Sequence, residues 1–120
     1  MAEDFAANGA PVDLEDLAQY RAEDSRIVVG SYRGYEIIGS DVPSAGVLTI
    51  QALNIMERFD PSSMSEPEWF AIVGQALGLA RGELAGLGTD SAAARATSKD
   101  YAQALAATIG APGQIGRAHV

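Results

Sequence analysis

The residues that could do chemistry gather in the stretch SYRGYEIIGSDVPSAG, which runs from Ser31 to Gly46. The hydroxyl of Ser44 could act as a nucleophile, or Ser44 could begin a helix as an anion site or as an N-cap. Its surroundings, VPSAG, lack the Gly-x-Ser-x-Gly elbow of serine hydrolases. The only histidine, His119, lies in the tail, where it could hardly serve as a base for Ser44. We therefore favour the helix cap.

Tyr32, Arg33 and Tyr35 offer a second kind of chemistry, because a guanidinium between two phenol rings could bind a carboxylate or stack on a ligand. Arg33-Gly34 also lies between two runs rich in β-branched and aromatic residues, which predicts a β-hairpin that turns there. Gly34 would supply a positive φ at little steric cost. We favour half-buried tyrosines beside a turn over a ligand site.

Composition excludes several classes of site and partner. The chain has no cysteine, and His119 has neither a second histidine nor a suitably spaced carboxylate, so we expect no metal and no cofactor. A net charge of -8, from 16 acidic and 8 basic residues, argues against binding to nucleic acid. We expect no membrane contact from this segment, because it has no basic run and no apolar stretch long enough for a span. The first residues lack the regions of a secretory signal.

The elements that position these residues follow from capping and periodicity. With 120 residues, 48% of them hydrophobic, the chain is large enough for one modest domain. Asp13 and Asp16, three apart, predict a capping box that starts a short helix with Leu14 and Leu17 pointing inward.

A second helix is predicted from about Ala45 to Arg58, with Ser44 as its N-cap. It is apolar around most of its circumference, apart from a narrow polar stripe at Gln51, Asn54 and Arg58. Such a helix is buried on several sides. We expect its neighbours to lie outside this chain.

A third helix is predicted to begin at the capping box of Ser65 and Glu68 and to reach about Ala85. Its core stripe is expected at Phe70, Val73, Leu77, Ala80 and Leu84. Glycines recur every fourth residue along a second ridge, at Gly74, Gly78, Gly82 and Gly86. Since each interior glycine costs roughly 1 kcal/mol against alanine, the ridge predicts the close approach of another helix.

The last helix, SKDYAQALAATI, is predicted to be capped by Thr97 and Asp100 and to stop at Gly110 and Pro112. Residues 111–120 show no periodicity and are expected to form an irregular tail.

Four motifs in fixed order resemble the gamma-glutamyltranspeptidase family. That family has an EDL..Y helix, a YRGY hairpin, a Pro-Pro-Pro-Ser-Ser-Gly-Gly step and a helix of LNILE..D type. The structural motif residues that match in this sequence are Asp16, Leu17, Tyr20, Tyr32, Arg33, Gly34, Tyr35, Pro43, Ser44, Gly46, Leu53 and Asn54. The resemblance covers roughly residues 1 to 110, and it departs from the family pattern at Asp41, Val42, Ala45 and Val47.

The resemblance implies an α+β fold, namely a helix-rich fragment with one β-hairpin, taken from an N-terminal-nucleophile hydrolase of α/β/β/α architecture. It implies that residues 1–110 are the last part of the large subunit. The parent enzyme would cut itself to expose a threonine, whose hydroxyl attacks γ-glutamyl amides of the glutathione type and passes the γ-glutamyl group to water or an amine. That threonine would follow the matched region. The resemblance therefore places no catalytic or substrate-binding residue within 1–120, and we expect the segment to be inactive alone.

The implied partners are the remainder of the large subunit, the small subunit and a γ-glutamyl substrate. Family members are often exported, so the resemblance suggests an exported or periplasmic parent, while the sequence itself leaves the compartment undetermined. Two alternatives stay open. One is a free-standing helical protein-interaction module that uses the glycine ridge, and the other is a self-contained serine hydrolase that uses Ser44.

Overall fold

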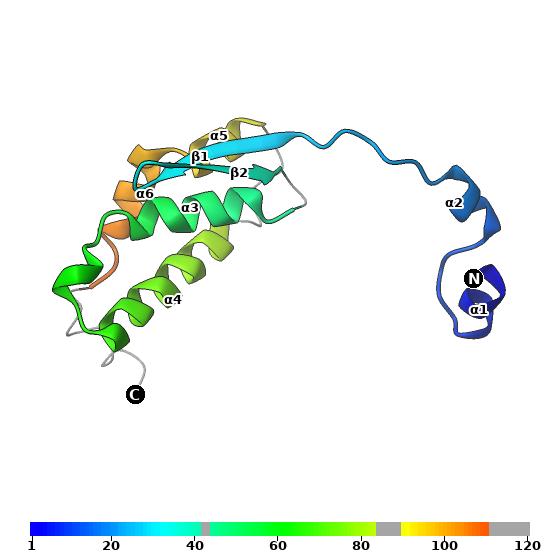
Figure 1. Ribbon diagram of the computed structural model, residues 1–120, viewed down its shortest axis with the longest axis horizontal. Helices are drawn as coiled ribbons and strands as arrows, with labels where there is room; N and C mark the ends of the chain where they lie inside the picture. The colour runs from blue at the N-terminus through cyan, green and yellow to red at the C-terminus, as the bar shows by residue number, and fades with distance from the viewer. Residues whose placement is uncertain (42–43, 84–89, 111–120) are drawn as a thin grey trace.

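The computed structural model describes residues 1–41, 44–83 and 90–110 and shows an N-terminal arm that projects from a body of helices and one hairpin (Figure 1). Within these residues the fold is α+β and rich in helix, with one two-stranded antiparallel sheet, which confirms the predicted fold class. The elements in chain order are α1 (Ala2–Ala7), α2 (Leu14–Gln19), β1 (Ile27–Tyr32), β2 (Tyr35–Ser40), α3 (Gly46–Met56), the 3₁₀-helix η1 (Pro61–Ser63), α4 (Glu66–Glu83), α5 (Asp90–Ala96) and α6 (Lys99–Ala106).

The arm carries α1 and α2, and neither helix contains a buried residue. The predicted capping box is confirmed, because the Asp16 N–H donates to Asp13 Oδ1 at 2.9 Å and the Asp13 N–H donates to Asp16 Oδ2 at 3.0 Å. The expected inward orientation of Leu14 is wrong, since 73% of its surface is exposed. Leu17 is half-buried. The physical reason is that the arm extends away from the body, which leaves α2 little to pack on (Figure 1).

The hairpin forms where it was predicted. Tyr32 pairs with Tyr35 at the turn, and the register continues to Ile27 opposite Ser40. Both turn residues have positive φ, 48° at Arg33 and 86° at Gly34, which is the conformation of a two-residue type I′ turn. The positive φ at Gly34 was expected, whereas the one at Arg33 was not.

The two faces of the hairpin differ in burial. Residues of β1 alternate between exposed and half-buried, and the half-buried set includes Val28 and Gly30. The opposite face exposes Ile27, Val29 and Ile38 at 63%, 52% and 61%. The sheet therefore packs on the body through one face and presents an apolar stripe on the other.

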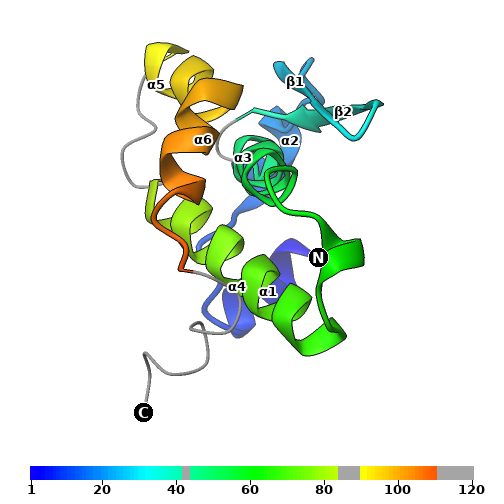
Figure 2. The same cartoon turned by 90° about the vertical axis from the view of Figure 1, so that its left-hand side faces the viewer.

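Helix α3 lies at the centre of the body, with the hairpin on one side and α4 and α6 on others (Figure 2). Its buried residues come from several sides of the helix: Val47, Ile50, Gln51, Ala52, Asn54 and Ile55. The expectation that its neighbours lie outside the chain is therefore wrong for the surfaces that the hairpin, α4 and α6 cover.

Two of the three residues in the polar stripe of this helix are buried. Gln51 and Asn54 are 1% and 0% exposed, and only Arg58, beyond the end of α3, is exposed. Asn54 is retained inside because its Nδ2 donates to the Thr97 carbonyl at 2.8 Å, which ties α3 to the segment between α5 and α6.

Glycines set how closely the hairpin approaches α3. An added Cβ at Gly46 would lie 2.2 Å from the Ser40 carbonyl oxygen, and one at Gly39 would lie 2.8 Å from Gly46 Cα. At Gly30 it would meet Ile50 Cγ2 at 2.5 Å. The close contact that glycine permits in this fold is thus between strand and helix.

The close approach of another helix that was predicted for the glycine ridge of α4 does not occur within the described chain. An added Cβ at Gly74, Gly78 or Gly82 would meet nothing within 4 Å, so no helix of the described chain approaches this ridge. Gly86 lies outside the described residues.

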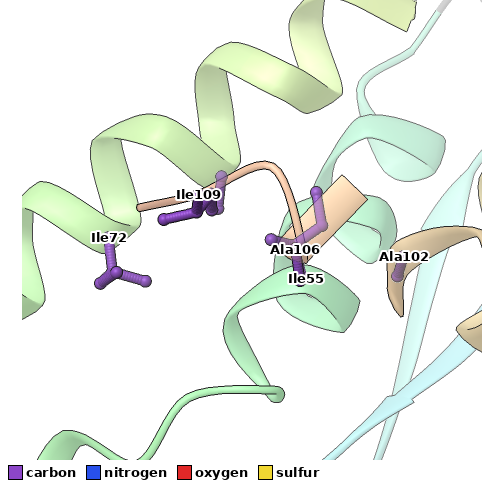
Figure 3. Close-up of a cluster of buried hydrophobic side chains, with 6 residues drawn as sticks. Ile55, Ile72, Ala102, Ala106 and Ile109 are labelled. Atoms are coloured by element: carbon purple, nitrogen blue, oxygen red, sulfur yellow. The ribbon is translucent and has the colours of Figure 1, made fainter. Parts of the chain in front are cut away.

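The core face of α4 is also rotated from the predicted stripe. The buried residues are Ile72, Ala76 and Ala80, while Phe70 and Leu77 are 62% and 45% exposed, so of that stripe only Ala80 is buried. Figure 3 shows Ile72 gathered with Ile55, Ala102, Ala106 and Ile109 from α3 and the α6 region. Apolar residues occur on both faces of α4, and the position of α3 and α6 selects the one that is buried. Leu84 lies outside the described residues.

Besides the capping box of α2, capping was predicted correctly at α4 and wrongly at α3 and α6. At α4, the Ser65 N–H donates to Glu68 Oε2 at 2.8 Å and the Glu68 N–H donates to Ser65 Oγ at 3.4 Å, as a capping box requires. At α3 the N-cap position is Ala45 and no side chain caps the helix, so the Ser44 cap is wrong. At α6 the cap is Ser98, which accepts from the Tyr101 N–H at 3.2 Å.

Thr97 is displaced from the capping role because its hydroxyl donates to the Ala93 carbonyl at 3.0 Å and so closes α5. The predicted stop at Gly110 fits the end of α6 at Ala106 and the turn that follows. Pro112 and the predicted irregular tail lie outside the described residues. Among the described helices, none has the length and hydropathy needed to cross a bilayer.

Substitution of Ser65 and of Ser44 tests which of these two serines caps a helix. We expect Ser65→Ala to lower the free energy of unfolding by about 1 kcal/mol, because α4 loses its N-cap acceptor. Ser44→Ala is the matched control, and its effect should be close to zero. Urea denaturation measures both, and an equal loss in the two variants would contradict the assigned caps.

The close approach of hairpin and helix gives a second test. Gly46→Ala should cost about 2 kcal/mol or more, since the new methyl meets backbone that cannot move aside cheaply. Gly82→Ala, which adds the same methyl into open space on α4, should be neutral or stabilising by up to about 1 kcal/mol. Thermal and denaturant unfolding compare the two; a stable Gly46→Ala variant would show that the contact is looser than described.

Candidate functional site

The tip of the hairpin is held against the end of α3 and the start of α6 by one carboxylate. The backbone N–H of Arg33 donates to Glu57 Oε1 at 3.1 Å. Lys99 Nζ forms an ion pair with Glu57 Oε2 and also donates to the Ser31 carbonyl at 2.6 Å. Three segments far apart in the sequence therefore meet at Glu57, at the end of the body where the turn lies (Figure 1). This group of Ser31, Arg33, Glu57 and Lys99 is called the turn anchor below.

The Arg33 side chain extends the turn anchor. Its Nη2 donates to the Phe59 carbonyl at 2.7 Å, and its Nε donates to Tyr32 Oη at 2.9 Å. Its Cζ also lies 5.1 Å from the centre of the Tyr32 ring. The hydrogen bond to Tyr32 raises the pKa of Arg33 above its ordinary value. These contacts support the turn interpretation of Arg33, because its Nε and Nη2 both donate to atoms of the protein itself. Tyr32 is half-buried as expected, whereas Tyr35 is 73% exposed.

The electrostatics of the turn anchor keep Glu57 ionised. The hydrogen bond from Lys99, and after it the one from the Arg33 backbone, hold the pKa of Glu57 below its ordinary value. The side chains of Lys99 and Glu57 are 42% and 29% exposed, so solvent screens much of their attraction. A carboxylate that accepts from two protein donors and has a lowered pKa is suited to holding elements together and poorly suited to proton transfer near neutral pH.

Apart from Ser44, the structure places the remaining described motif residues in two locations, at α2 on the arm and on α3. Asp16, Leu17 and Tyr20 lie at or next to α2 on the arm, and Tyr20 is 78% exposed. Gly46 and Asn54 lie on α3, as does the half-buried Leu53. Pro43 lies outside the described residues. The structure therefore brings Tyr32 to Tyr35 next to the end of α3, and it leaves the α2 residues apart from them.

A self-contained catalytic site around Ser44 finds no support in the described chain. Ser44 is exposed, and its backbone N–H donates to the Asp41 carbonyl at 2.9 Å. Residues 1–41, 44–83 and 90–110 contain no histidine that could act as its base. The same residues contain no group of three His, Cys, Asp or Glu side chains able to hold a metal ion. His119 lies outside them.

Glu57 and Lys99 are residues of the turn anchor whose pairing sequence reasoning missed. Glu57 ends the stretch LNIME, which corresponds to the LNILE motif of the family, but nothing local marks it as a partner of the turn, and Lys99 is 42 residues further along the chain. Only a three-dimensional arrangement connects them. The described elements thus define a helix-rich α+β segment. The charged residues of its turn anchor, Arg33, Glu57 and Lys99, make their contacts within the protein.

Comparison with known proteins identifies the family. The model of the family described as Gamma-glutamyltranspeptidase matches residues 1–117, so the chain belongs to that family. The crystal structure of Helicobacter pylori gamma-glutamyltranspeptidase aligns with 98% of this chain at a TM-score of 0.72 and 28% identity, and the chain covers 39% of that structure.

Two curated relatives match about half of the chain. The acylase ACY 1 proenzyme of Pseudomonas sp. (strain SE83) is 52% identical over 61 residues, and the glutathione hydrolase proenzyme of Escherichia coli (strain K12) is 39% identical over 61 residues. These matches take in 50% of this chain and 11% and 10% of the two relatives. The chain therefore corresponds to a small part of proteins that are much longer.

The turn anchor predicts a pH dependence whose sign follows from the pKa of Glu57. Because folding lowers that pKa, ionised Glu57 stabilises the fold above its ordinary value of about 4.5, and the contribution is lost as the pH falls through the lower, folded value. At neutral pH we expect Glu57→Gln to cost about 1 kcal/mol. The difference in unfolding free energy between wild type and variant should shrink below about pH 4.5.

The matched control is Glu36→Gln on the exposed face of β2, which should change stability little at any pH. Denaturant titrations across the acid range measure both variants. A Glu57→Gln penalty that stays constant with pH would contradict the assignment of an ionised, hydrogen-bonded carboxylate.

Proposed function

We propose that these residues are part of an enzyme that cleaves γ-glutamyl amides and passes the γ-glutamyl group to water or to an amine acceptor. The observation that carries the proposal is the family match over residues 1–117. A relative named as a glutathione hydrolase adds support, as does the structural likeness to a gamma-glutamyltranspeptidase. In this proposal residues 1–110 are a large-subunit segment and the following residues a tail.

The nucleophile in this proposal is a threonine outside residues 1–120, freed by self-cleavage of a precursor. Its hydroxyl attacks the γ-glutamyl carbonyl, the amine leaves with a proton, and water or an acceptor amine then resolves the acyl-enzyme. Both curated relatives named above are proenzymes, which fits a precursor that is cut. No residue of the segment is assigned to contact with the substrate.

The segment would contribute as scaffold. Its motif residues Tyr32 to Tyr35 form a turn fixed by Glu57 and Lys99, and Gly46 permits the hairpin to lie on α3. The opposite face of the hairpin exposes Ile27, Val29 and Ile38. An apolar sheet face of this kind suits packing against further polypeptide of the parent, as one layer of an α/β/β/α arrangement.

A second candidate is an acylase that acts on a different amide with the same nucleophile. It is favoured by one observation, namely that the two relatives named as acylases are 52% and 53% identical, against 39% for the bacterial glutathione hydrolase. The free-standing interaction module is not favoured, because the family match takes in nearly the whole chain.

Assay of the complete natural polypeptide that carries these residues tests the proposal. We expect self-cleavage into two chains, a new N-terminal threonine detected by mass spectrometry, and turnover of γ-glutamyl-p-nitroanilide and glutathione. Replacement of that threonine with alanine should abolish turnover, whereas Glu57→Gln should leave it measurable at low temperature.

Two results would count against this assignment. Turnover of simple N-acyl amides with none of γ-glutamyl substrates would favour the acylase. Activity without any cleavage, or in residues 1–120 alone, would contradict both candidates.

A further inference from the structure

The outer face of α4 is apolar and unpartnered in the described chain. Phe70 and Leu77 are 62% and 45% exposed, and they are seven residues apart, which is two helical turns and places them on the same side. Gly74 and Gly78 run beside them and leave open space where side chains would be. A shallow groove alongside is lined by Gly74, Gln75, Gly78, Leu79 and Thr108. The face thus combines two projecting apolar side chains with a strip where another backbone could come close.

We propose that this face binds α4 of a second copy of the protein, with the two helices antiparallel. A two-fold axis between helices requires that contacting residues lie at equal distances on either side of one centre. Phe70 and Leu77 are placed symmetrically about the Val73–Gly74 bond, so Phe70 of one copy lies against Leu77 of the other. Gly74 then lies next to the axis, where the backbones are closest.

The charges at the two ends of α4 indicate that the partner bound to this face is a second copy of the protein. Glu66 and Arg81 are exposed, at the first and last turns of α4, and they too are symmetric about the Val73–Gly74 bond. Neither makes an ion pair with the rest of the described chain. In the antiparallel arrangement each Glu66 faces an Arg81 of the other copy, so the same register satisfies both the apolar and the charged pair.

The inference is independent of the proposed function. It uses α4, which contributes nothing to the turn anchor, and it leaves the exposed face of the hairpin free for further polypeptide of the parent. Antiparallel packing also sets the macrodipoles of the two helices in favourable opposition.

Sedimentation velocity on the complete natural polypeptide, over a concentration series, tests the proposal. We expect a reversible dimer, and we expect Leu77→Lys to shift it to monomer, since the buried contact would then place two charges at the interface. Gln103→Lys, on an exposed position of α6, is the matched control and should leave the dimer intact.

A charge reversal tests the register. Arg81→Glu should weaken the dimer by about tenfold in dissociation constant, because symmetry turns two ion pairs into two repulsions at once. The double variant Glu66→Arg with Arg81→Glu should restore it. Failure of that rescue, with both variants folded, would overturn the register and with it the proposal.

A cysteine placed at Gly74 provides a direct measure of distance. The 120 residues contain no cysteine, so Gly74→Cys introduces the only thiol they carry, and mild oxidation should link two copies of the chain. Gln103→Cys should not cross-link. A monomer at every concentration, or a dimer that persists in Leu77→Lys, would overturn the proposal. So would a melting temperature of Leu77→Lys that lies below that of wild type at concentrations where wild type is itself monomeric, because that would place Leu77 inside the parent fold.

Discussion

The burial of α3 is the constraint on which the rest of the body depends. A helix that is apolar around most of its circumference has to be covered on several sides before its burial is favourable. The chain achieves this with a hairpin on one side and with α4 and α6 on others (Figure 2). The hairpin can lie close enough only because Gly39 and Gly46 leave room for backbone against backbone. The same packing around α3 buries Asn54 and Gln51, and Asn54 donates a hydrogen bond to the Thr97 carbonyl.

The turn anchor accounts for a local conformation that would otherwise be unfavourable. Arg33 has a φ of 48°, a region that costs a residue with a side chain roughly 1–2 kcal/mol. The cost is offset because the same residue donates from its backbone to Glu57 and from its guanidinium to the Phe59 carbonyl. A Tyr-Arg-Gly-Tyr sequence therefore has a structural explanation in this fold that requires no bound substrate, which agrees with a scaffold role in the proposed enzyme.

The body exposes two apolar surfaces, and they differ in what could cover them. The hairpin surface, with Ile27, Val29 and Ile38, is the outer face of a two-stranded sheet whose inner face packs on α3, and exposed apolar residues of this kind suit contact with further polypeptide. The α4 surface is a single helical stripe whose apolar and charged residues are symmetric about one point. Because half of this chain matches only about a tenth of its curated relatives, the first surface can be left to the parent and the second to another copy.

The sequence by itself determined the features whose cause is local or colinear. Arg33-Gly34 between two β-forming runs specified the hairpin, Asp13 with Asp16 and Ser65 with Glu68 specified two capping boxes, and four motifs in order specified the family. Only the tertiary structure decided which face of α4 is buried, that Asn54 is inside, and that Lys99 reaches Glu57. The physical reason is that caps and turns are satisfied within a few residues. Burial and ion pairs between elements depend on segments that arrive from far along the chain, as Lys99 does at Glu57.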